Sequence, residues 1–179
     1  MNNGDRVLVQ FPSYSKMAYF VSQDGDDMVV AVDEHGKRVH HRVYYRDVFR
    51  FQSCDPSDAK KFHEENFEEL KNEIVEAAGE LLPGVVLKTI PNEHTIVCES
   101  WGVRIVPDVM QTKGIGRVVE KPSWCVDYET LAGNYRDEGP LPDVVTVGNY
   151  ASTSLAAEAF ISCISERRIQ NHFESRSFF

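Results

Sequence analysis

The hydrophobic pattern of this chain changes its period near residue 55, and this change constrains the fold more than any other feature. Before it, apolar and polar residues alternate in short stretches separated by turn residues, which is typical of β-strands. From residue 55 to residue 82, apolar residues recur at steps of three and four, which predicts a long helix. A chain that carries both periods is expected to fold as an α+β protein.

The first 50 residues predict a small antiparallel sheet. Clusters of turn residues at 24–27 and 34–37 divide the segment into hairpins. The expected strands span residues 6–11, 17–23, 28–33, 38–45 and 48–51. Such a meander usually closes into a barrel, because closure removes the unpaired strand edges.

This N-terminal segment resembles a known kind of small barrel. Residues 4–9 (GDRVLV), the hairpin at Gly25 and the turn at Gly36 are similar to the layout of SH3-like barrels of the Tudor or KOW type. The resemblance covers about residues 4–52. It implies an antiparallel barrel that serves as a binding module for peptides, modified residues or nucleic acids.

The expected helix begins near Pro56, with Asp55 or Ser57 as its cap. Its apolar stripe comprises Phe67, Leu70, Ile74, Ala77, Ala78 and Leu81. Another face carries Glu65, Glu69, Glu73, Glu76 and Glu80. Like charges four residues apart destabilise a helix by a few tenths of a kcal/mol per pair. This glutamate face is therefore either a solvated surface or a surface that meets a basic partner.

The remainder of the chain predicts a second α+β portion. β-branched stretches at 85–90, 95–100 and 103–106 favour a second sheet, with further short strands at 117–119, 124–128 and 143–147. A closing helix is expected over about 155–171, and it can direct Leu155, Ala159, Phe160, Cys163 and Ile164 toward a core. The aromatic tail, with Phe173, Phe178 and Phe179, either folds back or contacts another chain. The expected domains are a barrel over 1–53, the acidic helix over 54–84 and an α+β domain over 85–179.

A basic strip with aromatic neighbours spans residues 37–50. It contains Lys37, Arg38, His40, His41, Arg42, Arg46 and Arg50, together with Tyr44 and Tyr45. Basic and aromatic side chains on one face are suited to phosphate contacts and base stacking. Acidic residues at Asp33, Glu34 and Asp47 oppose that interpretation, and they favour a solvated or internally paired face.

No recognised catalytic, metal or cofactor motif occurs in the chain. The histidines at 35, 40 and 41 match no known ligand spacing, and adjacent strand residues point to opposite faces. Cys125 and His94 are the one imaginable nucleophile and base pair, although an apolar setting favours a structural thiol. The four cysteines are expected to be free and mostly buried. We therefore expect neither an enzyme nor a cofactor.

Charge and composition indicate where the protein acts and what kind of partner it binds. The net charge is −9, and residues 55–82 hold nine acids against three bases. No signal peptide or apolar segment of membrane-spanning length is evident, so we expect a cytoplasmic protein without membrane contact. The acidic balance favours a protein partner with a basic surface.

The sequence thus favours a non-enzymatic interaction or inhibitor protein, similar in composition to accessory and counter-defence proteins of phages and mobile elements. The alternatives are a nucleic-acid-binding module that uses residues 37–50, and a DNA mimic that uses the glutamate face. The expected partner-binding residues are Lys37, Arg38, His40, Arg42, Tyr44, Tyr45, Arg46, Glu65, Glu69 and Glu73.

Overall fold

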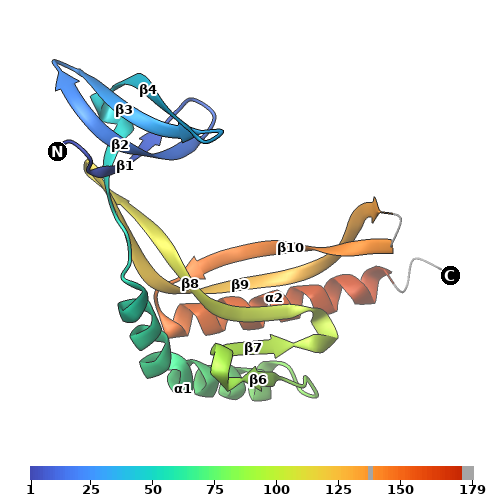
Figure 1. Ribbon diagram of the computed structural model, residues 1–179. Helices are drawn as coiled ribbons and strands as arrows, with labels where there is room; N and C mark the ends of the chain where they lie inside the picture. Colours follow the sequence, from blue (N-terminus) through green and yellow to red (C-terminus); the bar gives the residue numbers. More distant parts are fainter. Residues whose placement is uncertain (137–138, 175–179) are drawn as a thin grey trace. The chain divides into compact units, whose positions relative to one another are not determined.

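The computed structural model describes residues 1–136 and 139–174, and it describes side chains for residues 1–129 and 144–169. In this part of the chain ten β-strands and two α-helices are present, which confirms the expected α+β class (Figure 1). Two compact units form: one from Met1–Cys54 with Gln111–Glu120, the other from Asp55–Met110 with Lys121–Phe179. The side chain of Phe173 and the residues Phe178 and Phe179 lie outside the described residues.

The first unit contains the five N-terminal strands. They are β1 (Arg6–Gln10), β2 (Ser15–Asp24), β3 (Asp27–Glu34), β4 (Lys37–Tyr44) and β5 (Val48–Gln52). Their order is β4-β3-β2-β1-β5, and all neighbours are antiparallel. A 3-10 turn, Tyr45–Asp47, links β4 to β5. The alternation seen in the sequence buries one side, with Val7, Val9, Phe20, Val30, Val32 and Val48 in its core.

The expected closure of this barrel is wrong. Among the described residues, β5 pairs with β1 on one side and, in parallel, with the start of β9 (Arg117–Arg136) on the other. Residues 117–119 of β9 take the edge of β5 that closure would need. The tip of the long hairpin of β8 (Val103–Gly114) and β9, residues 111–120, belongs to the first unit. The separate second sheet expected from the sequence is also wrong, because all ten strands belong to one hydrogen-bonded sheet.

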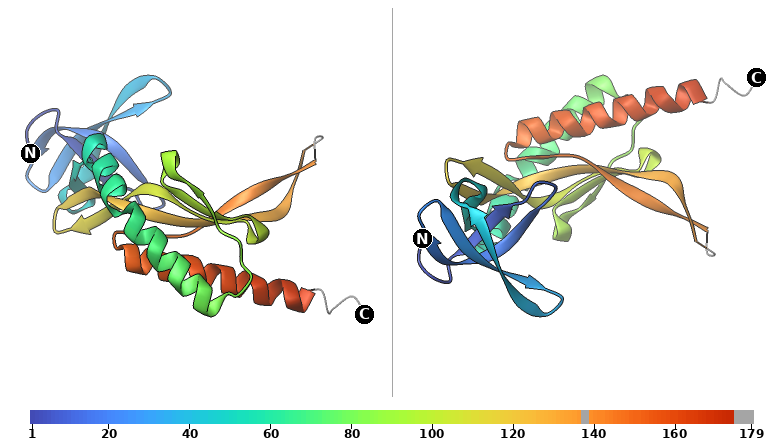
Figure 2. Two further views of the ribbon diagram at one scale, coloured as in Figure 1. Left: turned by 90° about the horizontal axis from the view of Figure 1, so that it is seen from below. Right: turned by 90° about the horizontal axis from the view of Figure 1, so that it is seen from above.

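The second unit packs two helices against the remaining strands. Its other elements are α1 (Pro56–Leu81), β6 (Lys88–Ile90), β7 (Thr95–Cys98), β10 (Gly139–Tyr150) and α2 (Thr153–Glu174). The two helices lie side by side (Figure 2). Their shared core with the sheet contains Leu70, Ile74, Ile96, Ile105, Trp124, Val126, Phe160 and Ile164, all of them no more than 1% exposed.

The N-terminus of α1 forms where the sequence predicts it. The Asp55 side chain accepts hydrogen bonds from the backbone amide (2.8 Å) and hydroxyl (2.6 Å) of Ser57, and Pro56 occupies the first turn. These hydrogen bonds lower the pKa of Asp55, because they favour its charged form.

Two helical residues do not lie where the periodicity places them. Leu81 is 64% exposed and Leu155 is 55% exposed, whereas Leu82 and His63 are buried. The last turn of α1 ends at Leu81, and the chain then carries the Leu82 side chain into the core. His63 continues the buried stripe of Phe67, Leu70 and Ile74 by one step of four residues.

Neighbouring positions on α1 offer a matched test of this packing. Ile74 is fully buried and Val75 is 55% exposed. We expect Ile74→Ala to lower the free energy of unfolding by about 2–5 kcal/mol, because it leaves a cavity in the core. Val75→Ala is expected to change it by less than about 0.5 kcal/mol. Urea denaturation followed by far-ultraviolet circular dichroism measures both, and equal effects of the two variants would contradict this assignment of the core.

Candidate partner-binding surfaces

The basic strip of the sequence divides between the two faces of β4. Alternation along the strand places Arg38, His40, Arg42 and Tyr44 on one face, where all four are exposed. Lys37 falls on the other face. We call Arg38, His40, Arg42, Tyr44 and the following Arg46 the basic face. Five of the seven residues expected to act in this strip are thus brought together.

Two cations of the basic face already have acidic partners on the neighbouring strand. Arg38 Nε lies 3.3 Å from Asp33 Oδ1, and Arg42 Nη1 lies 3.6 Å from Asp27 Oδ2. All four side chains are about half exposed or more. Exposed pairs of this kind contribute between about 0 and 1 kcal/mol, so a ligand could displace them at little cost.

The aromatic residues of this strip form a small cluster with Arg46. The Tyr44 and Tyr45 ring centroids are 4.9 Å apart, and the Arg46 guanidinium lies 5.8 Å and 5.6 Å from them. Arg46 Nε also donates a hydrogen bond to the Tyr45 hydroxyl (3.0 Å). These contacts hold Arg46 beside Tyr44 at the surface, where Tyr44 is 40% exposed.

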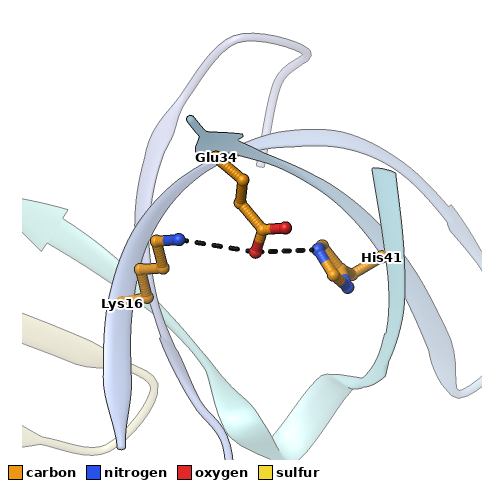
Figure 3. A network of polar contacts seen from close by, with 3 residues as sticks. All are labelled: Lys16, Glu34 and His41. Carbon is orange, nitrogen blue, oxygen red and sulfur yellow. Dashed lines mark hydrogen bonds and ion pairs between the residues drawn. The ribbon is translucent and has the colours of Figure 1, made fainter. Parts of the chain in front are cut away.

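His41 lies on the opposite face of β4 from His40 and interacts with Glu34. Glu34 Oε1 lies 3.4 Å from His41 Nε2 and 3.4 Å from Lys16 Nζ (Figure 3). Over the described residues, no group of three or more His, Cys, Asp or Glu side chains is placed to hold a metal ion. The histidine cluster considered in the sequence is therefore divided by the pleat of the strand.

The glutamates of α1 fall into two groups. Toward the N-terminus, Glu64 and Glu65 pair with Lys60 and Lys61 at 3.6 and 3.7 Å, and Glu68 pairs with Lys71 at 2.9 Å. Toward the C-terminus, Glu69, Glu73, Glu76 and Glu80 have no ion pair with any described residue. Of the three glutamates expected to contact a partner, Glu65 is thus neutralised within the helix, and Glu69 and Glu73 are not.

An acidic groove runs between the C-terminal half of α1 and the start of α2. Its volume is about 490 Å³, and four carboxylates line it: Glu73, Glu76, Glu80 and Glu158. The other lining residues are Ala77, Leu81, Ser154, Ala157, Ile161 and Ser162. None of the described residues that line this groove is cationic. Sequence reasoning missed Glu158, because only the packing of α2 against α1 brings it beside the glutamates of α1.

Charge accumulates in this groove at an energetic cost. Burial raises the pKa of the Glu73 carboxyl, and the neighbouring carboxylates of Glu69 and Glu76 raise it further. The ionised form of Glu73 is therefore less stable than that of an isolated glutamate. A cation in the groove would relieve this repulsion.

The Cys125 and His94 pair has no support in the geometry. Burial raises the pKa of the Cys125 thiol, and Asp127 and Asp108 raise it further, so these neighbours favour the protonated thiol. The His94 ring packs edge-on against Phe67 in the core, at 5.3 Å between centroids. Trp124 lies 6.3 Å from the same Phe67, and Cys125, the next strand residue, points to the opposite face of the sheet. The sheet thus separates thiol and imidazole.

Two buried polar groups were not foreseen from the sequence. Asp127 is 5% exposed on the face of the sheet opposite Trp124, and it accepts a hydrogen bond from Arg104 Nε at 2.5 Å. His63 is also 5% exposed, and its Nε2 donates to the carbonyl oxygen of Ser123 at 2.8 Å. Both sites are structural, because each satisfies a buried polar group within the second unit.

Comparisons with known proteins give no family for this chain: no protein-family model, curated protein or solved structure matches it. The described portion of the chain also holds no helix of the length and apolar character that crossing a membrane requires.

His63 provides a pH-dependent test of the packing beneath α1. Desolvation lowers the pKa of His63 from its ordinary value of 6.5, so the folded state binds its proton less readily than the unfolded state. Stability is therefore fully present above about pH 6.5 and is lost as the pH falls, with a slope of at most about 1.4 kcal/mol per pH unit. We expect His63→Gln, which keeps a donor for Ser123, to flatten this dependence.

Urea denaturation at several pH values measures that slope. The exposed His40 offers the matched control, and His40→Gln is expected to keep the wild-type dependence. An unchanged slope in His63→Gln would show that another group is responsible.

Proposed function

We propose that this chain is a non-enzymatic interaction protein that binds a basic surface of another protein through its acidic groove. The observation that carries the proposal is the lining of the groove, where the described residues supply four carboxylates and no cation. In the N-terminal half of α1, by contrast, Glu64 and Glu65 form ion pairs with Lys60 and Lys61. The groove retains unneutralised charge that a Lys- or Arg-rich partner complements.

The composition of the groove suits a helix or loop that carries both basic and apolar side chains. Leu81 is 64% exposed at one end, and Ala77, Ala157 and Ile161 line the groove between the carboxylates. Long basic side chains bury their methylene stems on such apolar surface while their charges meet the carboxylates. Electrostatic attraction accelerates association and weakens as salt is added.

The first unit supports the same class of function through its arrangement of strands. The order β4-β3-β2-β1-β5, with a 3-10 turn between β4 and β5, is similar to that of an SH3-like barrel. We propose that this unit is an SH3-like binding module. An accessory or inhibitor role of the phage and mobile-element kind follows as the biological setting, on the analogy of composition.

A second candidate function is single-strand nucleic acid binding by the basic face of β4. Arg38, His40, Arg42 and Tyr44 share that face, and Arg46 is held against Tyr44 and Tyr45. Cations beside an exposed aromatic ring are the usual elements of such a surface. The ion pairs to Asp33 and Asp27 reduce the positive field, which is why we rank this function second.

DNA mimicry by the acidic groove is a special case of the first proposal. It requires that the partner's basic surface be one that binds DNA, so DNA would compete with this protein for the partner. Competition in the capture assay described next separates a DNA mimic from other acidic ligands.

Two sets of substitutions on α1 test the groove. Glu73→Gln/Glu76→Gln/Glu80→Gln removes the charge of the groove, and Glu64→Gln/Glu65→Gln/Glu68→Gln removes the same number of charges from the paired N-terminal half. We expect the groove variant to lose a partner captured from nuclease-treated lysate and the control to keep it. We also expect the groove variant to unfold at a higher temperature, because repulsion around Glu73 is removed.

Equal capture by both variants would reject the groove as the binding surface. Loss of capture without any rise in the unfolding temperature would indicate disruption of α1 instead of loss of charge complementarity.

The second candidate predicts salt-sensitive binding of labelled single-stranded DNA or RNA, measured by fluorescence anisotropy. The slope of the logarithm of the binding constant against the logarithm of the salt concentration is negative, and Arg38→Gln/Arg42→Gln/Arg46→Gln should make it less steep by about 2. The reason is that about 0.7 counterions are released per phosphate contact. Lys16→Gln/Lys60→Gln/Lys61→Gln is the control of equal charge. No binding even at low salt would exclude this function.

A further inference from the structure

A second hollow of the second unit lies between the sheet and α2. It is a pocket of about 420 Å³, lined by residues of β9, β10 and α2, and α2 packs against β10 beside it (Figure 1). Among the described residues, Ser162 borders both this pocket and the acidic groove, but none of the four groove carboxylates lines the pocket. Small-molecule sites have volumes of about 300–1,000 Å³, so the pocket is large enough for a small ligand.

A β-bulge directs the end of β10 into this pocket. The pairing of β10 with β9 shifts between Thr146 and Gly148, so Val147 is the extra residue of the bulge. A bulge changes the direction in which the following side chains point. Beyond it, Tyr150 lies opposite Trp124, which is fully buried against α1. Tyr150 therefore faces the helices and not the other side of the sheet.

Two tyrosine rings form the sheet side of the pocket. Tyr128 lies four residues after Trp124 on β9, so alternation places it on the same face. The Tyr150 ring folds back over Gly148, where a Cβ atom would lie 2.9 Å from the Tyr150 hydroxyl oxygen. Neither tyrosine hydroxyl has a hydrogen-bond partner among the described residues. The pocket thus presents two aromatic rings with available hydroxyl groups.

Arg167 contributes a fixed positive charge to the pocket. Its Nε donates to the carbonyl oxygen of Trp101 (2.7 Å), and its Nη2 donates to that of Glu129 (2.9 Å). The guanidinium lies 4.5 Å from the centroid of the Tyr128 ring. Its other N–H groups have no partner among the described residues. Because the side chain is already ordered, a carboxylate that binds it does not bear the entropic cost of ordering it.

The next residue toward the N-terminus of α2 supplies the opposite charge. Glu166 also lines the pocket, is exposed, and forms no ion pair with any described residue. The remaining wall includes Val145, Val147, Ala159 and Cys163. Burial raises the pKa of the Cys163 thiol, which is therefore uncharged at neutral pH. The lining combines one cation, one carboxylate, two aromatic rings and an apolar wall.

We propose that this pocket binds a free aromatic amino acid, with its carboxylate on Arg167, its ammonium group on Glu166 and its ring against Tyr128 and Tyr150. This zwitterion complements every charged group of the lining, and aromatic rings pack favourably against one another. An aromatic anion would be repelled by Glu166 and by the net charge of −9, and an aromatic cation would be repelled by Arg167. The site goes beyond the proposed function and does not depend on the acidic groove.

Isothermal titration calorimetry of the full chain tests the site, with L-phenylalanine and L-tryptophan as probes. We expect each to bind at one molecule per chain. Three analogues each lack one recognised group: 3-phenylpropionate lacks the ammonium, phenethylamine the carboxylate and L-leucine the ring. Each is expected to bind at least about tenfold more weakly than L-phenylalanine. Absence of binding by both amino acids would overturn the proposal, and so would L-leucine binding as tightly as L-phenylalanine.

Two neighbouring arginines provide a matched pair of variants. Arg167→Gln removes the cation of the pocket and is expected to weaken L-phenylalanine binding at least about tenfold, because a charge-assisted hydrogen bond is lost. Arg168→Gln removes an exposed charge one residue further along α2, and Arg168 is not among the described lining residues. We expect this control to bind like the wild type. Equal weakening by both variants would contradict the assignment of the carboxylate to Arg167.

Glu166→Gln gives a test that does not disturb the backbone contacts of Arg167. Because Glu166 is exposed, the variant is expected to fold normally. It should weaken L-phenylalanine binding without weakening 3-phenylpropionate binding, since only the first ligand carries an ammonium group. Glu64→Gln, which removes the same charge from α1, is expected to leave both affinities unchanged. A Glu166→Gln chain that keeps the wild-type preference for L-phenylalanine over 3-phenylpropionate would overturn the proposal.

Discussion

The burial of Trp124 is the constraint on which the second unit depends. Its indole is fully buried, and it contacts Phe62, His63 and Phe67 of α1. Because side chains alternate along a strand, this burial decides that Val126 also faces the helices and that Cys125 and Asp127 face away. It also decides the rotation of α1: with His63, Phe67 and Leu70 directed at the sheet, the glutamates on the other side of the helix cannot be buried in the core. The acidic groove is a consequence of hydrophobic packing beneath it.

The basic strand β4 of the first unit and the C-terminal half of α1 in the second unit differ in whether their charges are paired. In the first, cations of β4 are matched by aspartates on β3, and Glu34 is matched by Lys16 and His41. In the second, the α1 carboxylates from Glu69 onward meet further carboxylates; burial raises the pKa of Glu73, and the charges of Glu69 and Glu76 raise it further. Unrelieved repulsion lowers stability, and the basic partner that we propose for the groove would relieve it.

Sequence reasoning succeeded where local chemistry decides the outcome. The α+β class, the start of α1 at Pro56 and the five N-terminal strands were predicted, because each depends on periodicity and turn or capping residues within a few positions. It failed where distant segments compete for the same edge or the same core. The closed barrel was wrong because residues 117–119 pair with β5. Leu155 was misplaced because α2 buries Ala156 instead, whereas Phe160 is buried as predicted.

The sequence by itself determined which residues could be charged, apolar or helical, and therefore the existence of a glutamate-rich helix and a basic strand. The tertiary structure alone decided which of these charges remain available. Ion pairs within α1 and across β3 and β4 neutralise some of them, whereas the packing of α2 adds Glu158 to the glutamates of α1. The reason is that Coulomb interactions act between neighbours in space, and a linear pattern of charge does not specify which neighbours the hydrophobic core will bring together.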